Sequence, residues 1–233
     1  MTTFQLSHPS MSDPICFDEN DLPFSEIYGD HYYSRNDGRA ECAHVFLAGN
    51  GLPTRWGEVD HFTIGELGFG TGLNFLETWA TWQRTRKPNQ QLRFISVEAH
   101  PIDAETAKRA LSPWPELHEL GNKVLCKWDD IFSETQMDEQ TTLHVFLGKA
   151  DKMLPSYPKV NAWFLDGFAP SKNSEMWSEE LMRLVAERTV NGGTCASYTA
   201  AGWVRRNLEA AGFAMEKRAG FGTKRDMIAG VKL

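Results

Sequence analysis

Apolar residues from His61 onward alternate between short continuous runs and longer stretches of helical period. Short apolar runs bounded by turn residues are typical of buried strands, and apolar residues repeated every three or four positions predict helices. The pattern predicts strands at Phe62–Leu67, Leu92–Glu98, Leu143–Leu147, Ala162–Leu165 and Thr194–Tyr198. It predicts helices at Asn74–Arg86, Ile102–Ser112, Ser178–Thr189 and Ala201–Ala211. This alternation indicates an α/β domain with a mostly parallel sheet.

Turn-forming residues mark the boundaries of this domain and of its last elements. Residues 1–60 contain many of them, with short strands or helical turns between, for example around Cys42–Leu47, and we interpret this part as an N-terminal appendage. The Asn-Gly-Gly run at 191–193 predicts a turn before the fifth strand. Phe213–Arg218 and Met227–Val231 flank a glycine-rich connection and predict an antiparallel hairpin. The expected architecture is a Rossmann-like domain over residues 61–233 with one reversed strand.

Composition places the chain among ordinary soluble globular proteins, with 41% apolar and 24% charged residues. It has no apolar run long enough to span a membrane, and residues 1–20 lack the pattern of a secretion signal. Four cysteines without a CxxC pair indicate reduced thiols, a cytoplasmic location and no metal site. The net charge of −7 argues against nonspecific coating of nucleic acid but permits a local basic patch.

A glycine-rich turn between the first strand and the first helix is the strongest local signal. Residues 66–72 read Glu-Leu-Gly-Phe-Gly-Thr-Gly. Glycines permit positive φ and close approach of a ligand to the backbone, and the following helix N-terminus favours a carboxylate or phosphate. A dinucleotide motif would place a third glycine at position 73, which is Leu73, so the turn favours S-adenosylmethionine (SAM) over NAD. We expect cofactor contacts from Glu66, Gly68, Gly70, Thr71, Gly72 and Asn74.

Acidic residues follow two further strands at the edge where ligands bind in open α/β sheets. Glu98 ends the second strand, where a carboxylate can accept hydrogen bonds from ribose hydroxyls. Asp166 follows the fourth strand and is held by an abrupt turn through Gly167 and Pro170. The alternatives are an exposed glutamate at a strand end and a turn-capping aspartate. The position of both carboxylates in the fold favours functional roles.

The chain resembles the methyltransferase half of MnmC, also found as the stand-alone MnmD. The resemblance lies in Val45–Asn50, Gly65–Leu76, Ala162–Asn173 with Met176 and Trp177, Gly202–Arg206 and Lys217–Met227. It implies a SAM-dependent methyltransferase fold and methylation of the exocyclic amine of 5-aminomethyl-2-thiouridine at the tRNA wobble position. In the two-domain family members a FAD-dependent oxidase domain follows and first removes a carboxymethyl group. That domain and its FAD are not expected in these 233 residues, so the oxidase is a fused or separate partner.

The resemblance also implies roles for individual residues. Asp166 is expected to orient the acceptor amine and take its proton, and the rings of Phe168 and Trp177 to stack on the uracil, although core packing explains both rings equally well. The family usually has Gly-Asp after the third strand, where this chain has Gly148 and Lys149, so Asp151 is the candidate for the adenine contact. Further substrate contacts, including those with the anticodon stem-loop, are expected from Pro170, Lys172, Arg205, Arg206, Lys224 and Arg225, with Lys217 and Arg218 as additional basic residues.

Three alternatives remain open on the sequence alone. The first keeps SAM but transfers the methyl group to a small-molecule or protein amine. The second is an NAD(P)-dependent oxidoreductase, against which Leu73 argues. The third is a non-catalytic binding module, which the presence of both Glu98 and Asp166 at strand ends disfavours.

Overall fold

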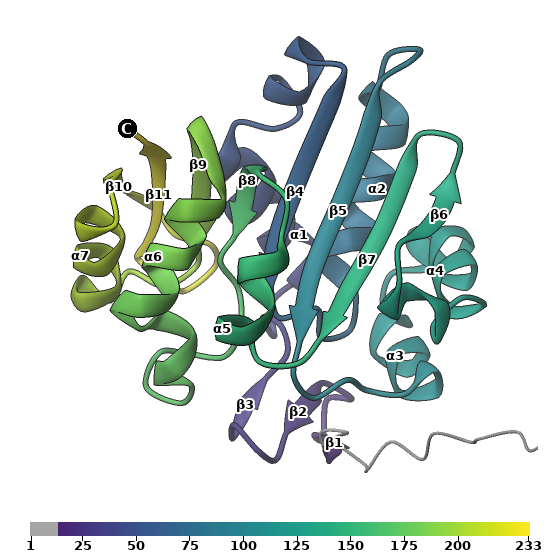
Figure 1. Cartoon of the computed structure of the whole chain (residues 1–233). Helices are drawn as coiled ribbons and strands as arrows, with labels where there is room; N and C mark the ends of the chain where they lie inside the picture. The colour runs from purple at the N-terminus through teal and green to yellow at the C-terminus, as the bar shows by residue number, and fades with distance from the viewer. Residues whose placement is uncertain (1–13) are drawn as a thin grey trace, which may run out of the picture.

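The computed structural model describes residues 14–233 and is centred on an eight-stranded sheet (Figure 1). The strands are β4 (His61–Leu67), β5 (Gln91–Glu98), β6 (Thr135–Asp138), β7 (Thr141–Leu147), β8 (Val160–Phe164), β9 (Thr189–Ser197), β10 (Phe213–Ala219) and β11 (Asp226–Lys232). Their order across the sheet is β10-β11-β9-β8-β4-β5-β7-β6. The chain moves outward from β4 through β5 to β7 and then returns to the other side of β4 at β8. Ligands in open α/β sheets bind at such a reversal, outside the carboxyl ends of the strands.

Helices cover both faces of the sheet (Figure 1). One face carries α2 (Leu73–Thr85), α3 (Ala104–Leu111) and α4 (His118–Leu125), and the other carries α5 (Ala150–Met153), α6 (Glu179–Arg188) and α7 (Gly202–Ala210). Phe75 of α2 packs edge-on against Phe94 of β5, with ring centroids 5.2 Å apart. On the opposite face Val185 of α6 and Trp163 of β8 belong to a second core. The sheet is therefore buried on both sides, which explains its apolar strands.

The N-terminal segment lies across the carboxyl edge of the parallel strands (Figure 1). It forms a three-stranded sheet of β1 (Ile15–Phe17), β2 (Pro23–Ser25) and β3 (Asp30–His31), followed by α1 (Gly38–Glu41) and a π-helical turn at Cys42–Leu47. Val45, Phe46 and Trp56 are buried in the same core as α2. The N-terminal segment thus contributes to the central core. The division of the chain into an appendage of residues 1–60 and a domain of residues 61–233 stays a prediction. The predicted absence of a secretion signal concerns residues 1–20, of which residues 1–13 lie outside the described residues.

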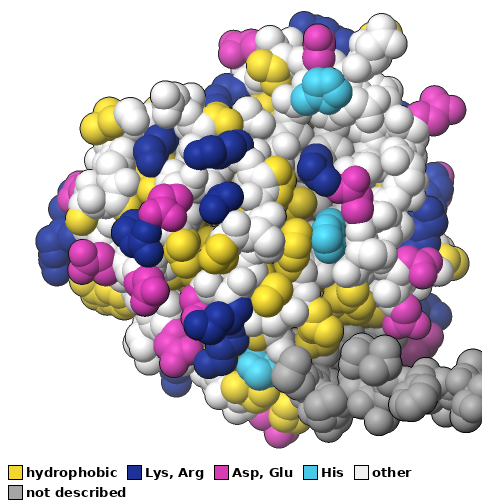
Figure 2. All heavy atoms as spheres, viewed as in Figure 1, with side chains coloured by type: hydrophobic (Ala, Val, Ile, Leu, Met, Phe, Trp, Pro, Cys, Tyr) yellow, Lys and Arg dark blue, Asp and Glu magenta, His cyan; other side chains and the backbone are white. Residues whose placement is uncertain are grey.

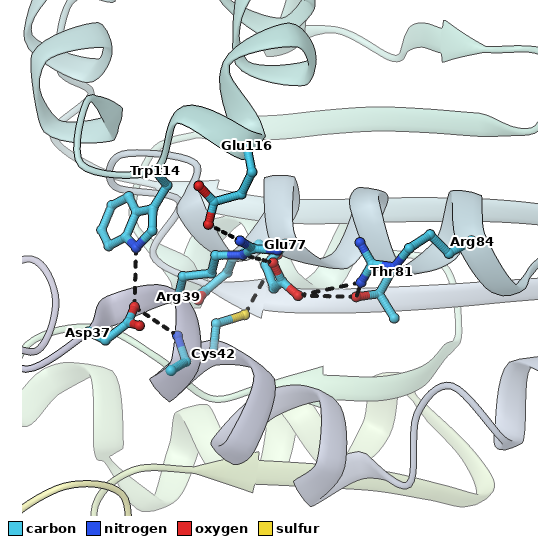
Figure 3. Close-up of polar contacts among 10 residues, drawn as sticks. Asp37, Arg39, Cys42, Glu77, Thr81, Arg84, Trp114 and Glu116 are labelled. Carbon is cyan, nitrogen blue, oxygen red and sulfur yellow. Dashed lines mark hydrogen bonds and ion pairs between the residues drawn. The ribbon is translucent and has the colours of Figure 1, made fainter.

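A polar network fixes α1 against the helical layer (Figure 3). Asp37 caps α1 by accepting a hydrogen bond from the backbone N–H of Ala40, and it also accepts one from Nε1 of Trp114, each at 3.1 Å. Arg39 forms ion pairs with Glu77 of α2 and with Glu116, and the Glu77 side chain is only 6% exposed. A buried carboxylate requires such a partner because its isolated charge is costly in the interior. These contacts hold the N-terminal segment in place, and this segment forms one wall of a cavity at the carboxyl edge of the sheet.

Most predicted elements are confirmed to within a few residues. The structure differs from the prediction in one turn, in the number of reversed strands and in a few short elements. Ser178 is the N-cap of α6, and its hydroxyl accepts a hydrogen bond from the Leu181 N–H. The predicted turn at residues 191–193 is wrong, because these residues continue β9, with Gly192 at φ +71 in an irregular part of the strand. Two strands are reversed instead of one, β11 and β6. The short elements β6, α4 and α5 were not predicted, because each offers too few positions to establish a period.

Candidate active site

A cavity of about 550 Å³ opens at the carboxyl edge of the parallel strands. The glycine turn after β4, Glu98 at the end of β5 and the loop after β8 form one side. The opposite wall comes from the N-terminal segment, with Tyr32, Arg35 and Glu41 among its residues. Glu66 of β4 pairs with Phe164 of β8, which places the turn beside Asp166. The predicted cofactor turn after β4 and the predicted catalytic Asp166 after β8 therefore lie at one cavity.

The three glycines of the turn all have positive φ, at +87° for Gly68, +52° for Gly70 and +79° for Gly72. Residues with a Cβ rarely adopt this backbone conformation. A Cβ at Gly70 would also lie 3.0 Å from Cδ1 of Tyr32 on the opposite wall. Gly72 caps α2 without a side chain, so the positive end of the α2 dipole lies at the turn. The Gly68 and Gly70 backbone therefore lines the cavity without a Cβ, and the N-terminus of α2 beside it favours an anionic group.

Glu98 is held by two backbone hydrogen bonds. Its Oε2 accepts from the Gly70 N–H at 2.9 Å, and its Oε1 accepts from the His100 N–H at 2.8 Å. Each carboxylate oxygen can accept a second hydrogen bond. Glu98 lines the cavity, so it remains suited to bind hydroxyl groups of a ligand.

Asn74 connects two carboxyl groups. Its Nδ2 donates to Oδ2 of Asp166 at 2.7 Å and to Oε1 of Glu66 at 2.9 Å. Glu66 is fully buried behind the cavity lining, and its Oε2 accepts a hydrogen bond from Ser96 at 2.7 Å. Because both amide hydrogens of Asn74 are used, Asn74 fixes Asp166 relative to α2.

The pKa values of Asp166 and Glu66 are both raised above their ordinary values. Burial is the largest cause that raises the pKa of Asp166 to about 7, although hydrogen bonds from Asn74 and Gly167 oppose the rise. Burial likewise raises the pKa of Glu66 well above its ordinary value. Asp166 can therefore exchange a proton near neutral pH, which suits a general base, whereas burial favours the protonated form of Glu66, which supports Asn74.

Aromatic rings form part of the cavity wall. Phe168 stacks on Tyr28 with centroids 4.4 Å apart, and Tyr32 packs edge-on against Phe168 at 5.1 Å. Tyr198 follows β9 and donates a hydrogen bond of 2.7 Å to the carbonyl of Gly167, the residue after Asp166. Flat apolar rings next to polar groups are suited to a planar ligand such as a nucleobase.

Lys224 lies in the cavity wall, where it contacts protein groups. Its Nζ donates to Oε1 of Glu41 at 2.6 Å and lies 4.1 Å from the centroid of the Tyr198 ring. Lys224 comes from the loop between β10 and β11, and Glu41 ends α1. The ion pair therefore connects the N-terminal segment to the C-terminal hairpin at the cavity wall.

The structure does not bring every predicted site residue to the cavity. Trp177 is fully buried and donates from Nε1 to the Phe168 carbonyl at 3.1 Å, so it supports the loop from behind. Asp151 pairs with Lys152 at the surface of α5, away from the cavity lining. Arg205 pairs with Glu209 one helical turn away. Pro170 is buried outside the lining, whereas Lys172, Arg206 and Arg225 are exposed.

Surface charges are mixed in sign on the face shown in Figure 2, where Lys and Arg lie among Asp and Glu. In the C-terminal hairpin Lys217 pairs with Asp226, and Arg218 pairs with Glu216. Among residues 14–233 no group of three or more His, Cys, Asp and Glu side chains is placed to hold a metal ion. In that part of the chain no helix combines the length and apolarity needed to cross a lipid bilayer.

Sequence reasoning missed the wall contributed by the N-terminal segment and by Tyr198. Tyr198 follows a strand, as Glu98 and Asp166 do, so the strand-end rule could have found it. The tyrosines near residue 30 gave only a weak signal, because aromatic residues in a turn-rich segment pack in many ways. Glu41 carried no local signal, since its meeting with Lys224 spans 183 residues of sequence.

Comparison with known proteins identifies the family. Residues 115–233 match a family described as S-adenosyl-L-methionine-dependent methyltransferase. The tRNA 5-methylaminomethyl-2-thiouridine biosynthesis bifunctional protein MnmC of Caulobacter sp. (strain K31) is 42% identical over 97% of this chain and 39% of its own length. The protein of the same name from Vibrio cholerae serotype O1 (strain M66-2) is 43% identical over 89% of this chain and 33% of its own length. The chain thus spans well under half of these curated relatives.

A solved structure agrees with this result. The crystal structure of MNMC2 from Aquifex aeolicus superposes with a TM-score of 0.73 and 25% identity, covering 94% of this chain and 70% of that chain. The expected resemblance to MnmC and the Rossmann-like fold are both confirmed. The chain therefore belongs to the family of S-adenosyl-L-methionine-dependent methyltransferases.

Proposed function

We propose that this methyltransferase acts on the exocyclic amine of 5-aminomethyl-uridine or its 2-thio form at the wobble position of tRNA. The observation that carries the proposal is the placement of Asp166 in the same cavity as the glycine turn. The names of the MnmC relatives support the choice of acceptor. By this proposal the tRNA anticodon stem-loop is the partner, and the protein works in the cytoplasm.

The residues around the cavity fit SAM. Gly68, Gly70 and Thr71 line the cavity, and Gly68 and Gly70 present backbone without a Cβ there, whereas Gly72 lies outside the lining. In this proposal the turn holds the anionic end of the cofactor and Glu98 holds hydroxyl groups of the ribose. Bound SAM supplies a methyl group already activated on a sulfonium. The family match favours SAM over the NAD(P) alternative.

Asp166 serves the acceptor in this proposal. A protonated amine has no lone pair with which to accept a methyl group, so a proton must leave. The Asp166 carboxylate, with a pKa of about 7, can orient the amine and accept that proton directly or through one water. Its position is fixed by Asn74 and by the Gly167 N–H, which donates at 2.8 Å to Oδ1. Phe168, held between Tyr28 and Tyr32, supplies the ring against which the base stacks.

The RNA surface is proposed from exposed cations, one of which lines the cavity. Arg35 lines the cavity with a side chain that is 63% exposed, and Lys172, Arg206 and Arg225 are also exposed. A few cations can bind the phosphates of one stem-loop even on an acidic protein, because phosphate contacts are local. A FAD-dependent oxidase, fused or separate, would supply the aminomethyl substrate by removing a carboxymethyl group.

The test is methyl transfer from SAM to wobble-hypomodified tRNA, followed by mass spectrometry of the nucleosides. Wild type should produce the 5-methylaminomethyl nucleoside, and Asp166→Ala should lose about 100-fold or more in rate while still binding SAM. Asp151→Ala is the matched control, since it removes a carboxylate outside the cavity. Methylation of a small-molecule or protein amine without methylation of tRNA would establish the alternative acceptor.

A further inference from the structure

An ion pair in the cavity wall lies close to the loop that carries Asp166. Lys224 reaches in from the loop between β10 and β11, and its Nζ lies 2.6 Å from Oε1 of Glu41. The Glu41 residue is 8% exposed, whereas the Lys224 side chain is 41% exposed. Both residues line the cavity together with Asp166. Charges placed in a partly closed cavity act on one another more strongly than charges in bulk water.

Tyr198 joins the pair to the Asp166 loop. The Lys224 ammonium lies over the Tyr198 ring at 4.1 Å, and the Tyr198 hydroxyl donates at 2.7 Å to the Gly167 carbonyl. This chain of contacts fixes the cation relative to the backbone next to Asp166. Burial raises the pKa of Tyr198 well above its ordinary value, so its hydroxyl remains a neutral donor.

The surroundings of Asp166 contain several other polar groups. Its direct hydrogen-bond donors are Asn74 and the Gly167 N–H, and Glu66 lies on the far side of Asn74. Asp30 accepts from the Ala169 N–H at 3.1 Å on the same loop. The titratable and charged groups that line the cavity with Asp166 or act on it include Asp30, His31, Tyr32, Tyr33, Arg35, Glu41, Cys42, Glu66, Glu98, Tyr198 and Lys224. Lys224 is the cation whose charge favours an ionised Asp166, in addition to the hydrogen bonds from Asn74 and Gly167.

We propose that Lys224 and Glu41 are positioning residues that set how readily Asp166 gives up its proton, with Lys224 favouring the ionised carboxylate and Glu41 favouring the protonated form. The inference rests on the proposed role of Asp166 as the base and goes beyond it by assigning the groups that adjust that base. The charges of Glu41 and Lys224 indeed act on the pKa of Asp166 in these opposite directions. The same cation also disfavours a protonated amine in the cavity, since like charges repel.

Two substitutions that break the same ion pair separate this proposal from a structural role. Lys224→Met removes the positive charge, so the pKa of Asp166 should rise by about half a unit to one unit. Glu41→Gln keeps the side-chain shape and removes the negative charge, so that pKa should fall by a similar amount. If the ion pair were merely structural, the pKa of Asp166 should shift in the same direction in both variants, because each variant loses the same contact.

The primary measurement is a ¹³C NMR titration of the Asp166 side-chain carboxyl in the full chain, assigned with Asp166→Asn. Lys224→Arg should retain the wild-type midpoint. Lys123→Met is the control for a general change in net charge, because Lys123 pairs with Glu119 on the exposed face of α4. Opposite shifts in Lys224→Met and Glu41→Gln would establish the proposal. Shifts of the same sign, or none, would overturn it.

The pH profile of kcat/KM on hypomodified tRNA gives the second readout. Its acid limb should move to higher pH in Lys224→Met and to lower pH in Glu41→Gln. Opposite NMR shifts with an unmoved rate profile would show that Lys224 and Glu41 act on Asp166 but that Asp166 is not the base. The NMR titration needs no acceptor, so its result is independent of whether tRNA is the substrate.

Discussion

Asn74, in the first turn of α2, donates a 2.7 Å hydrogen bond to Oδ2 of Asp166, a residue 92 positions further along the chain. The bond crosses the point of the sheet where the chain reverses, between β4 and β8. It joins the glycine turn, which we assign to the cofactor, to the carboxylate that we assign to the acceptor. One amide side chain thus sets the relative position of the two halves of the cavity.

The pH dependence of methyl transfer should report on Asp166. Because the base must be ionised and its pKa is about 7, kcat/KM should fall below pH 7 and approach a tenfold loss per pH unit. Rates measured between pH 5.5 and 8.5 test this expectation. Asp166→Asn should lack the break near neutrality, so a break that persists in this variant belongs to another group.

Glu66 should make the stability of the protein depend on pH. Since burial raises the pKa of Glu66 well above its ordinary value, the folded protein keeps a proton that the unfolded chain releases above about pH 4.3. The stability contributed by this group is full at low pH and declines by about 1.4 kcal/mol per pH unit until the folded pKa is reached. Glu66→Gln should gain in free energy of unfolding relative to wild type as the pH rises from 5 to 8, as measured by urea denaturation.

Glu66→Ala is the contrasting variant. Gln can accept from Asn74 and donate to Ser96, whereas Ala leaves both groups without this partner and opens a space in the core. We expect Glu66→Ala to be about 2–4 kcal/mol less stable than Glu66→Gln at every pH, because neither variant titrates at this position. Equal stability of the two variants would contradict a supporting role for a neutral Glu66.

Gly70 should be required for SAM binding. Gly70→Ala places a Cβ 3.0 Å from Tyr32 Cδ1 and imposes a positive φ on a non-glycine residue. SAM affinity measured by calorimetry should fall at least about tenfold, because the side chain enters the space kept for the ligand. Gly192→Ala is a matched control, since Gly192 also has a positive φ of +71° but its Cβ would meet nothing within 4 Å. That control should cost about 1 kcal/mol of stability and leave SAM affinity unchanged.

Arg39 should be a major anchor of the N-terminal wall. Arg39→Met leaves the buried Glu77 carboxylate without its main partner, and we expect a loss of about 3 kcal/mol in the free energy of unfolding. The double variant Arg39→Met/Glu77→Met should recover most of that loss. Lys123→Met breaks an exposed pair with Glu119 and should change stability by less than about 0.5 kcal/mol. Recovery below half of the loss would mean that Arg39 acts mainly through packing.

The sequence by itself determined the features that depend on neighbouring residues. The alternation of apolar runs and helical periods predicted the order of strands and helices, because burial on one or both faces imposes these periods locally. The glycines at positions 68, 70 and 72 predicted a turn with positive φ, and all three have positive φ in the structure. Glu98 and Asp166 were found because a strand end in a parallel sheet fixes the edge on which a side chain lies.

Only the tertiary structure decided which distant residues meet. Packing placed the N-terminal segment over the cavity and brought Glu41 to Lys224, although no local pattern relates the two residues. It also buried Trp177 behind the loop and left Asp151 paired with Lys152 outside the cavity. The physical reason is that side-chain periodicity encodes which face of an element is buried, whereas the partner buried against that face depends on how the whole chain packs.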